Sequence, residues 1–254
     1  MRAWVVAVVG AVALLPAAPA RAEQIGIDYA DIGPVPADPT QRAVDVEAAP
    51  GEQNDITVRA TDPTPIDPID PGSGGWPLTV TVTDQHATFD PTPPTGDLAC
   101  EVLDAHTARC AAPPGSHFVQ AFLQLGDGNN HAQFASDTVP LREQFLAGDG
   151  NDVVSTGPFA GDASYRWASD LGGGNDTIHI GPWRRDGFGG GVPPTGLAVY
   201  LGAGNDTAYS INGAADVIDC GTGNDTLYAD PFDTNQIYSP PPGVCENRLP
   251  PAAP

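Results

Sequence analysis

The sequence predicts an all-β chain that winds into a parallel β-solenoid, with a small β cap at its amino-terminal side. A pentapeptide of the form Gly-x-Gly-Asn-Asp, or a near copy of it, recurs in tandem and indicates a repeat architecture. Apolar residues alternate on both sides of each copy, which is typical of strands that bury one face. The copies begin at Gly126, Gly148, Gly172, Gly202 and Gly221.

Residues 1–22 have the form of a secretory signal peptide. Arg2 precedes an apolar run from Trp4 to Leu15, and Ala20-Arg21-Ala22 is typical of a cleavage site. The run is too short to span a bilayer, since a membrane helix needs about 20 residues. We therefore expect a secreted chain that begins at Glu23 and does not insert into membranes.

The chain is strongly acidic. It has 32 Asp and Glu against 10 basic residues, all of them Arg, for a net charge of -22. Loss of Arg2 and Arg21 would leave 8 against 32, or -24. This charge argues against nucleic acid as a partner. It also opposes compaction, and bound divalent cations would relieve the repulsion.

The amino-terminal half is expected to hold two regions. Residues 23–42 are Pro-rich and acidic, which predicts a disordered segment. We assign residues 43–117 to an all-β cap, in which the β-branched run Leu78 to Thr83 is the clearest strand. Within this cap, residues 44–58 read as strand, turn and strand, and resemble an incomplete first copy of the repeat.

The four cysteines predict disulfides, because the chain carries a signal for export. Three connectivities exist, and the local one is simplest: Cys100 with Cys110 and Cys220 with Cys245. The first pair would staple a hairpin in the cap. The second would fold residues 231–254 over the last repeat as a carboxy-terminal cap.

Residues 118–230 are assigned to the repeats. The first glycines of successive turns are 22, 24, 30 and 19 residues apart, and a coil of two nine-residue halves needs about 18. Each step therefore fits one coil with insertions, the largest being Trp183 to Pro194. Apolar residues flank each turn and are expected to face a shared interior. They are Leu123, Leu125, Ala132, Phe145, Ala147, Val154, Leu171, Ile178, Val199, Leu201, Ala208, Ile218, Cys220 and Leu227.

The turns offer oxygen ligands for calcium. Two glycines permit positive φ and expose carbonyl groups, and an aspartate adds an anionic oxygen. One turn supplies too few oxygens, so we expect ions between stacked turns, with the weakest binding where Asn130 replaces Asp. The expected ligands are Asp152, Asp176, Asp206 and Asp225, auxiliary Asp127 and Asp149, Asn130, and the carbonyls of Gly126, Gly128, Gly148, Gly150, Gly172, Gly174, Gly202, Gly204, Gly221 and Gly223. The alternative is turn chemistry without metal, which Asn and Asp also favour.

Two segments carry a resemblance to a known family. Leu171-Gly172-Gly173-Gly174-Asn175-Asp176-Thr177-Ile178-His179 and Cys220 to Tyr228 resemble the nonapeptide Gly-Gly-x-Gly-x-Asp-x-U-x of the hemolysin-type (RTX, repeats-in-toxin) calcium-binding family. The resemblance covers about residues 118–230 and implies a right-handed parallel β-roll that binds Ca²⁺. The first glycine of the motif is absent from every copy. The tail from Asp219 to Glu246 looks like the corresponding block of secreted actinobacterial members.

The sequence does not predict an enzyme. It contains neither His-Glu-x-x-His nor Gly-x-Ser-x-Gly, and its histidines lack zinc spacing. Gly115-Ser116-His117 places a nucleophile beside a base, but we interpret it as a loop. A non-enzymatic calcium-binding protein is the main expectation. The alternatives are an adhesion or interaction module whose insertion at Trp183 to Pro194 binds an extracellular partner, and a hydrolase with an unrecognised site.

Overall fold

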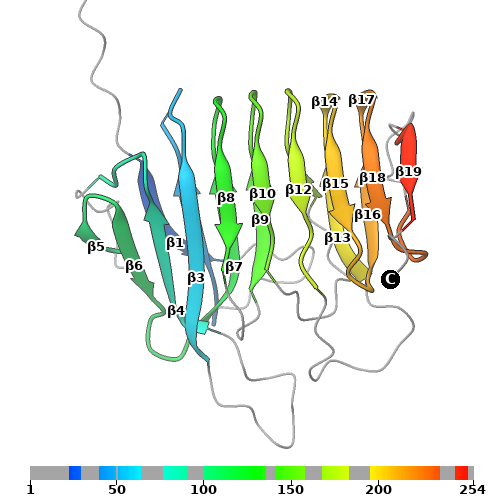
Figure 1. The fold of residues 1–254 in the computed structure, drawn as a ribbon. Coiled ribbons are helices and arrows are strands. Elements are labelled where there is room, and N and C mark those ends of the chain that lie inside the picture. The colour runs from blue at the N-terminus through cyan, green and yellow to red at the C-terminus, as the bar shows by residue number, and fades with distance from the viewer. Residues whose placement is uncertain are drawn as a thin grey trace, which may run out of the picture.

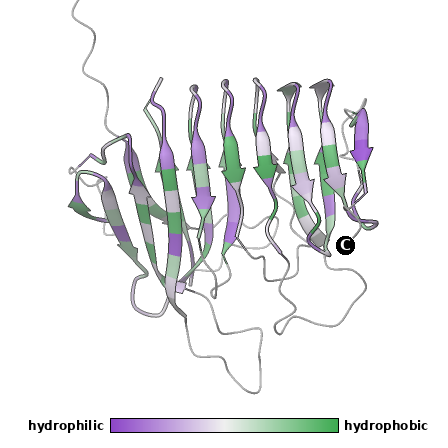
Figure 2. Ribbon diagram, viewed as in Figure 1, coloured by the Kyte–Doolittle hydropathy of each residue, from purple (hydrophilic) through white to green (hydrophobic). Residues whose placement is uncertain are grey.

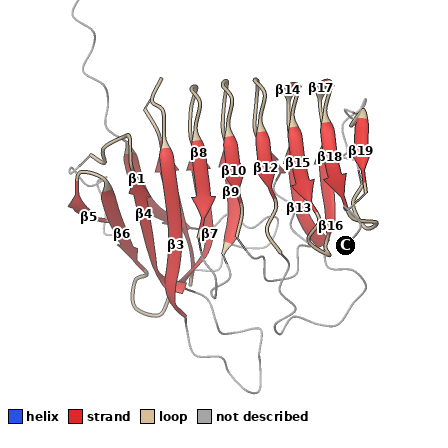
Figure 3. Cartoon of the chain, in the orientation of Figure 1, coloured by secondary structure: helices blue, strands red, loops and turns tan. Residues whose placement is uncertain are grey.

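The computed structural model describes residues 23–29, 40–49, 51–63, 77–90, 100–135, 141–157, 168–182, 195–234 and 244–250. Within these ranges every regular element is a strand and none is a helix (Figure 3). The predicted all-β class is confirmed. No helix in the described ranges is long and apolar enough to cross a membrane.

Two large sheets, together with one short pair of strands, contain all of these strands (Figure 1). One sheet has seven strands, in the order β1 (Gln24–Tyr29), β2 (Gln41–Glu47), β7 (His117–Gln124), β9 (Arg142–Leu146), β11 (Ala168–Asp170), β13 (Thr195–Tyr200) and β16 (Ala215–Asp219). The other has ten, in the order β19 (Asn247–Leu249), β18 (Thr226–Ala229), β15 (Thr207–Ser210), β12 (Thr177–His179), β10 (Val153–Ser155), β8 (His131–Phe134), β3 (Asp55–Pro63), β4 (Pro77–Asp84), β6 (Thr107–Ala111) and β5 (Glu101–Asp104). The short pair joins β14 (Ala203–Gly204) to β17 (Thr222–Gly223).

The chain passes from the seven-stranded sheet to the ten-stranded sheet through each repeated turn. β9 leads through the turn at Gly148 to β10, and β16 leads through the turn at Gly221 to β18. Successive passes pair in parallel, for example Val154 with Ile178 and Ile178 with Ala208. This register brings all the turns to one edge, at the top of Figure 1.

The core lies between the two sheets. Every apolar position expected to face inward is buried, and the larger ones include Phe145, Leu171, Ile218 and Leu227 at 0% exposure. Figure 2 shows hydrophobic and hydrophilic residues alternating along the strands. A single pass cannot bury its apolar face alone, so stacking of passes makes one continuous core.

The amino-terminal region differs from the expectation. The segment at residues 23–42 was expected to be disordered, but it contains β1 and the start of β2, because Ile25 and Ile27 alternate and are buried. β2 and β3 pair in parallel with β7 and β8. The incomplete first copy is therefore a full member of the parallel stack, which begins at Gln41 and continues through the region assigned to the cap.

Antiparallel strands complete this end of the molecule. β4 pairs antiparallel with β3 and β6, and β5 with β6. Cys100 is bonded to Cys110 and Cys220 to Cys245, as predicted. The second disulfide brings β19 to β18, with which it pairs in parallel. The insertion at Trp183 to Pro194 lies outside the described residues.

Candidate functional site

The repeated turns superimpose along the edge of the stack. Both glycines of every turn have positive φ, from 70° at Gly126 to 151° at Gly204. A methyl group added at Gly202 would strike the carbonyl oxygen of Gly172 in the preceding turn. Glycine is therefore required both by φ and by the close approach of the neighbouring backbone.

Backbone hydrogen bonds join each turn to the next. The N–H of Gly150 donates to the carbonyl of Gly173 at 2.6 Å, and that of Gly174 to the carbonyl of Ala203 at 2.7 Å. In the opposite direction, the N–H of Gly173 donates to the carbonyl of Gly148 at 3.0 Å. The turns are thus in vertical register, and their carbonyl groups lie close together.

Four buried aspartates form a row behind these turns, which we call the carboxylate ladder: Asp152, Asp176, Asp206 and Asp225. Oδ1 of each accepts a hydrogen bond from the backbone N–H of the preceding member. Asp152 N–H donates to Asp176 at 2.8 Å, and Asp206 N–H donates to Asp225 at 2.9 Å. One carboxylate oxygen per residue therefore fixes the stacking of the turns.

The other carboxylate oxygen of each ladder residue is buried without a hydrogen-bond donor. This applies to Oδ2 of all four aspartates. Burial raises the pKa of Asp176 to about 7 and the pKa of Asp152 and of Asp206 to about 6, and it raises that of Asp225 as well. A buried carboxylate oxygen with no donor requires a proton or a cation.

The hydrogen bonds of Asn130 show which groups surround the second side-chain atom at the ladder position. Asn130 occupies the ladder position of the first copy, and its Nδ2 donates to the carbonyls of Gly126, Gly128 and Ala147 at 3.2 to 3.3 Å. The residues at the same positions in the next copy are Gly148, Gly150 and Leu171. Their carbonyls are acceptors only, so an aspartate oxygen placed there has no protein donor to meet.

The two auxiliary aspartates lie elsewhere. Asp127 and Asp149 are exposed at the rim of the turns and do not join the buried ladder. The N–H of Asp149 donates to Oδ1 of Asp127 at 3.4 Å. A second row of exposed asparagines runs along the same rim, and there Oδ1 of Asn151 accepts from the N–H of Asn175 at 2.7 Å.

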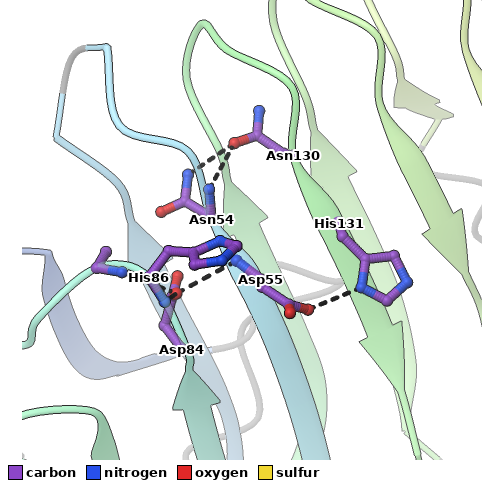
Figure 4. Close-up of polar contacts among 7 residues, drawn as sticks. Asn54, Asp55, Asp84, His86, Asn130 and His131 are labelled. Carbon is purple, nitrogen blue, oxygen red and sulfur yellow. Dashed lines mark hydrogen bonds and ion pairs between the residues drawn. The ribbon is translucent and has the colours of Figure 1, made fainter.

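Two residues that continue this row beyond the ladder were not predicted as site residues. Asn54 precedes Asn130, and both its N–H and its Nδ2 donate to Oδ1 of Asn130 (Figure 4). Glu246 follows Asp225 and accepts from the N–H of that residue at 2.9 Å. The only signal for Asn54 was the incomplete first copy. Glu246 is placed by the neighbouring Cys220–Cys245 bond, which spacing alone does not locate.

No set of three or more His, Cys, Asp or Glu side chains in the described ranges is gathered into a metal centre. A cation at the turns would therefore depend on backbone carbonyls with one or two carboxylates. Such an oxygen-only set suits Ca²⁺, which accepts backbone carbonyls readily. The residues present fit that ion because the Oδ2 atoms lack any other partner.

Ser116, the possible nucleophile of Gly115-Ser116-His117, forms a hydrogen bond within its own loop. Ser116 Oγ donates to the carbonyl of Pro113 at 2.7 Å.

Searches with this chain found no matching protein-family model, no similar curated protein and no similar solved structure. Any functional conclusion therefore rests on the geometry of the turns.

Proposed function

We propose that this chain is a secreted, non-enzymatic calcium-binding protein of the hemolysin-type (RTX) kind, in which the stacked turns form one edge of a right-handed β-roll. The observation that carries the proposal is the contrast between two atoms at the same ladder position. Nδ2 of Asn130 donates to three carbonyl oxygens. Oδ2 of each ladder aspartate has no donor.

The negative charge of the whole row favours a cation over protons beside the unpartnered Oδ2 atoms. The ladder aspartates are close enough that Asp152 and Asp206 both raise the pKa of Asp176. At neutral pH, ionisation of the whole row would place like charges side by side in a poorly solvated edge. Bound calcium supplies positive charge and coordination to oxygen atoms that protein donors leave unsatisfied.

The residues that would hold the ion are divided between two roles. The carboxylates of Asp152, Asp176, Asp206 and Asp225 supply the charge, and the paired glycines of each turn supply carbonyls. Asp127 and Asp149 remain at the rim, where they raise the local negative potential. The side-chain amide of Asn130 already donates to the three backbone carbonyls around it. We therefore expect no ion in its place.

Export supports the same proposal. Two disulfides and the signal-like residues 1–22 are consistent with an extracellular protein. Extracellular calcium modules bind at about 0.1 to 1 mM. Binding in that range would couple folding of the chain to release into a calcium-rich medium.

Scanning calorimetry of the secreted chain tests the proposal. The melting temperature should rise as calcium is added to chelator-treated protein, because the ion binds the folded state in preference to the unfolded state. Far-ultraviolet circular dichroism reports whether strand content rises in parallel. Equal melting temperatures in chelator and in millimolar calcium would refute the proposal, and magnesium at the same concentration is the control.

A further inference from the structure

A second group of carboxylates lies at the amino-terminal end of the stack, outside the repeats. Asp84 is at the end of β4, Glu52 is in the turn between β2 and β3, and Glu23 immediately precedes β1. Asp84 and Glu52 lie close enough to Glu23 for their charges to act on its carboxyl group. The ladder aspartates are on the other side of β3, beyond β8.

Asp84 is anchored by backbone donors. Its Oδ1 accepts from the N–H groups of His86 at 2.7 Å, Ala87 at 2.9 Å and Asp55 at 3.2 Å (Figure 4). Glu23 is anchored through its backbone, which donates to the carbonyl of Thr88 and accepts from the N–H of Asp90, both at 2.9 Å. The positions of both side chains are therefore set by the sheet.

The remaining oxygens of this pair have no donor. Glu23 and Asp84 are both 0% exposed, and Oε1 and Oε2 of Glu23 and Oδ2 of Asp84 have no hydrogen-bond partner. Burial, followed by the charges of Asp84 and Glu52, raises the pKa of Glu23 to about 9. These three buried oxygens without donors are stable only if a positive charge lies beside them or Glu23 is protonated.

We propose that Glu23 and Asp84 form a separate cation site that holds Ca²⁺, with the half-buried Glu52 beside it. Hard anionic oxygens from these two carboxylates suit this ion, and water or backbone oxygens would complete its coordination. The site would fasten the strand β1 to the end of β4. Since Glu23 is the expected first residue of the mature chain, the ion would also secure the new amino terminus.

This site is independent of the proposed function of the turns. Two amide side chains, Asn54 and Asn130, separate it from Asp152. Removal of the ladder carboxylates therefore leaves it intact. A failure of calcium binding at the turns and a failure at this site can be observed separately.

The test begins with a background variant that carries Asp152→Asn, Asp176→Asn, Asp206→Asn and Asp225→Asn. Asn130 shows that an amide is compatible with the ladder position. Bound calcium is measured by equilibrium dialysis at pH 7.5. One ion per chain should remain in this background, and Glu23→Gln together with Asp84→Asn should remove it. Glu47→Gln, at an exposed position on β2, is the matched control and should retain the ion.

Loss of all calcium from the background variant would overturn the proposal, because no ion would then be bound outside the ladder. If the background does not fold, the wild-type chain with and without Glu23→Gln and Asp84→Asn serves instead, and the bound calcium should fall by one ion. The double change should also raise the melting temperature in chelator and abolish part of the rise with calcium. A lower melting temperature in chelator, with the calcium response unchanged, would likewise overturn the proposal.

The amino terminus itself is a competing source of positive charge. Chains that begin at Glu23 and at Ala22 should bind the same number of calcium ions. Calcium uptake at this site only in the longer chain would show that the α-ammonium group of Glu23 occupies it, and the proposal would be wrong.

Discussion

The backbone N–H of Asn130 donates a hydrogen bond of 2.7 Å to Oδ1 of Asp152, in the next turn of the stack. The same bond links Asp152 to Asp176 and Asp176 to Asp206. One oxygen of each side chain therefore stacks the turns. The chemical difference between Asn and Asp is confined to the second atom, which faces the carbonyl groups.

Replacement of Asp176 by Asn should change stability with opposite sign in chelator and in calcium. In chelator the amide supplies a donor to the carbonyls, so the free energy of unfolding should rise by about 1–3 kcal/mol. In saturating calcium the variant should be less stable than the wild type, since it has lost a ligand. Urea denaturation measures both. The rim variant Asp149→Asn should shift stability by less than about 0.5 kcal/mol in chelator.

The reverse change, Asn130→Asp, should extend the carboxylate ladder by one member. Without calcium the variant should be destabilised, because it buries an oxygen without a donor beside Asp152. With calcium it should bind one more ion per chain than the wild type. Isothermal titration calorimetry gives the stoichiometry. An unchanged number of ions would contradict our interpretation of the three carbonyls around Asn130 as part of a calcium site.

The metal-free protein should become more stable as the pH falls from 8 to 5. Burial raises the folded-state pKa of Asp176 from 3.8 to about 7 and that of Asp152 and Asp206 to about 6. Between the unfolded and folded pKa values the folded state binds more protons, so the free energy of unfolding decreases with rising pH. The contribution of these three groups to the free energy of unfolding should become independent of pH above about pH 7.

In saturating calcium this trend should weaken or reverse, because protons and the ion compete for the same carboxylates. Melting temperatures recorded at each pH in chelator and in calcium provide the comparison. A chelator-treated protein that is most stable at pH 8 would show that the ladder is not held neutral by protons in the absence of metal.

Gly202→Ala should be far more disruptive than Gly213→Ala. Both glycines have positive φ, 98° and 81°, so each substitution incurs about 1–2 kcal/mol of backbone strain. The added methyl group meets no atom within 4 Å at Gly213, but at Gly202 it would strike the carbonyl of Gly172. Chemical denaturation of both variants separates the cost of backbone strain from that of the steric clash. An equal loss of stability in the two variants would argue against close stacking of the turns.

The prediction of the repeats succeeded because their signals are local and periodic. The alternation around Leu123, Phe145 and Leu227 follows the pleat of a strand, and residues of this type bury the face that they share. The prediction of disorder for residues 23–42 was wrong because it rested on the three prolines and the acidic residues of this segment. Two short strands within or at the end of it, β1 and β2, form through pairing with each other and with β7, and composition does not report pairing.

By itself, the sequence determined the all-β class, the buried face of each repeat and the four aspartates of the ladder, because each depends on residue type and short spacing. It favoured the local disulfide pairing among three, and the structure has that pairing. Only the tertiary structure decided that Asn54 and Glu246 extend the ladder and that Glu23 lies beside Asp84. These residues are far apart in the chain, and none lies in the five repeated turns. Parallel register and sheet order bring them together, and those are set by the burial of the whole core.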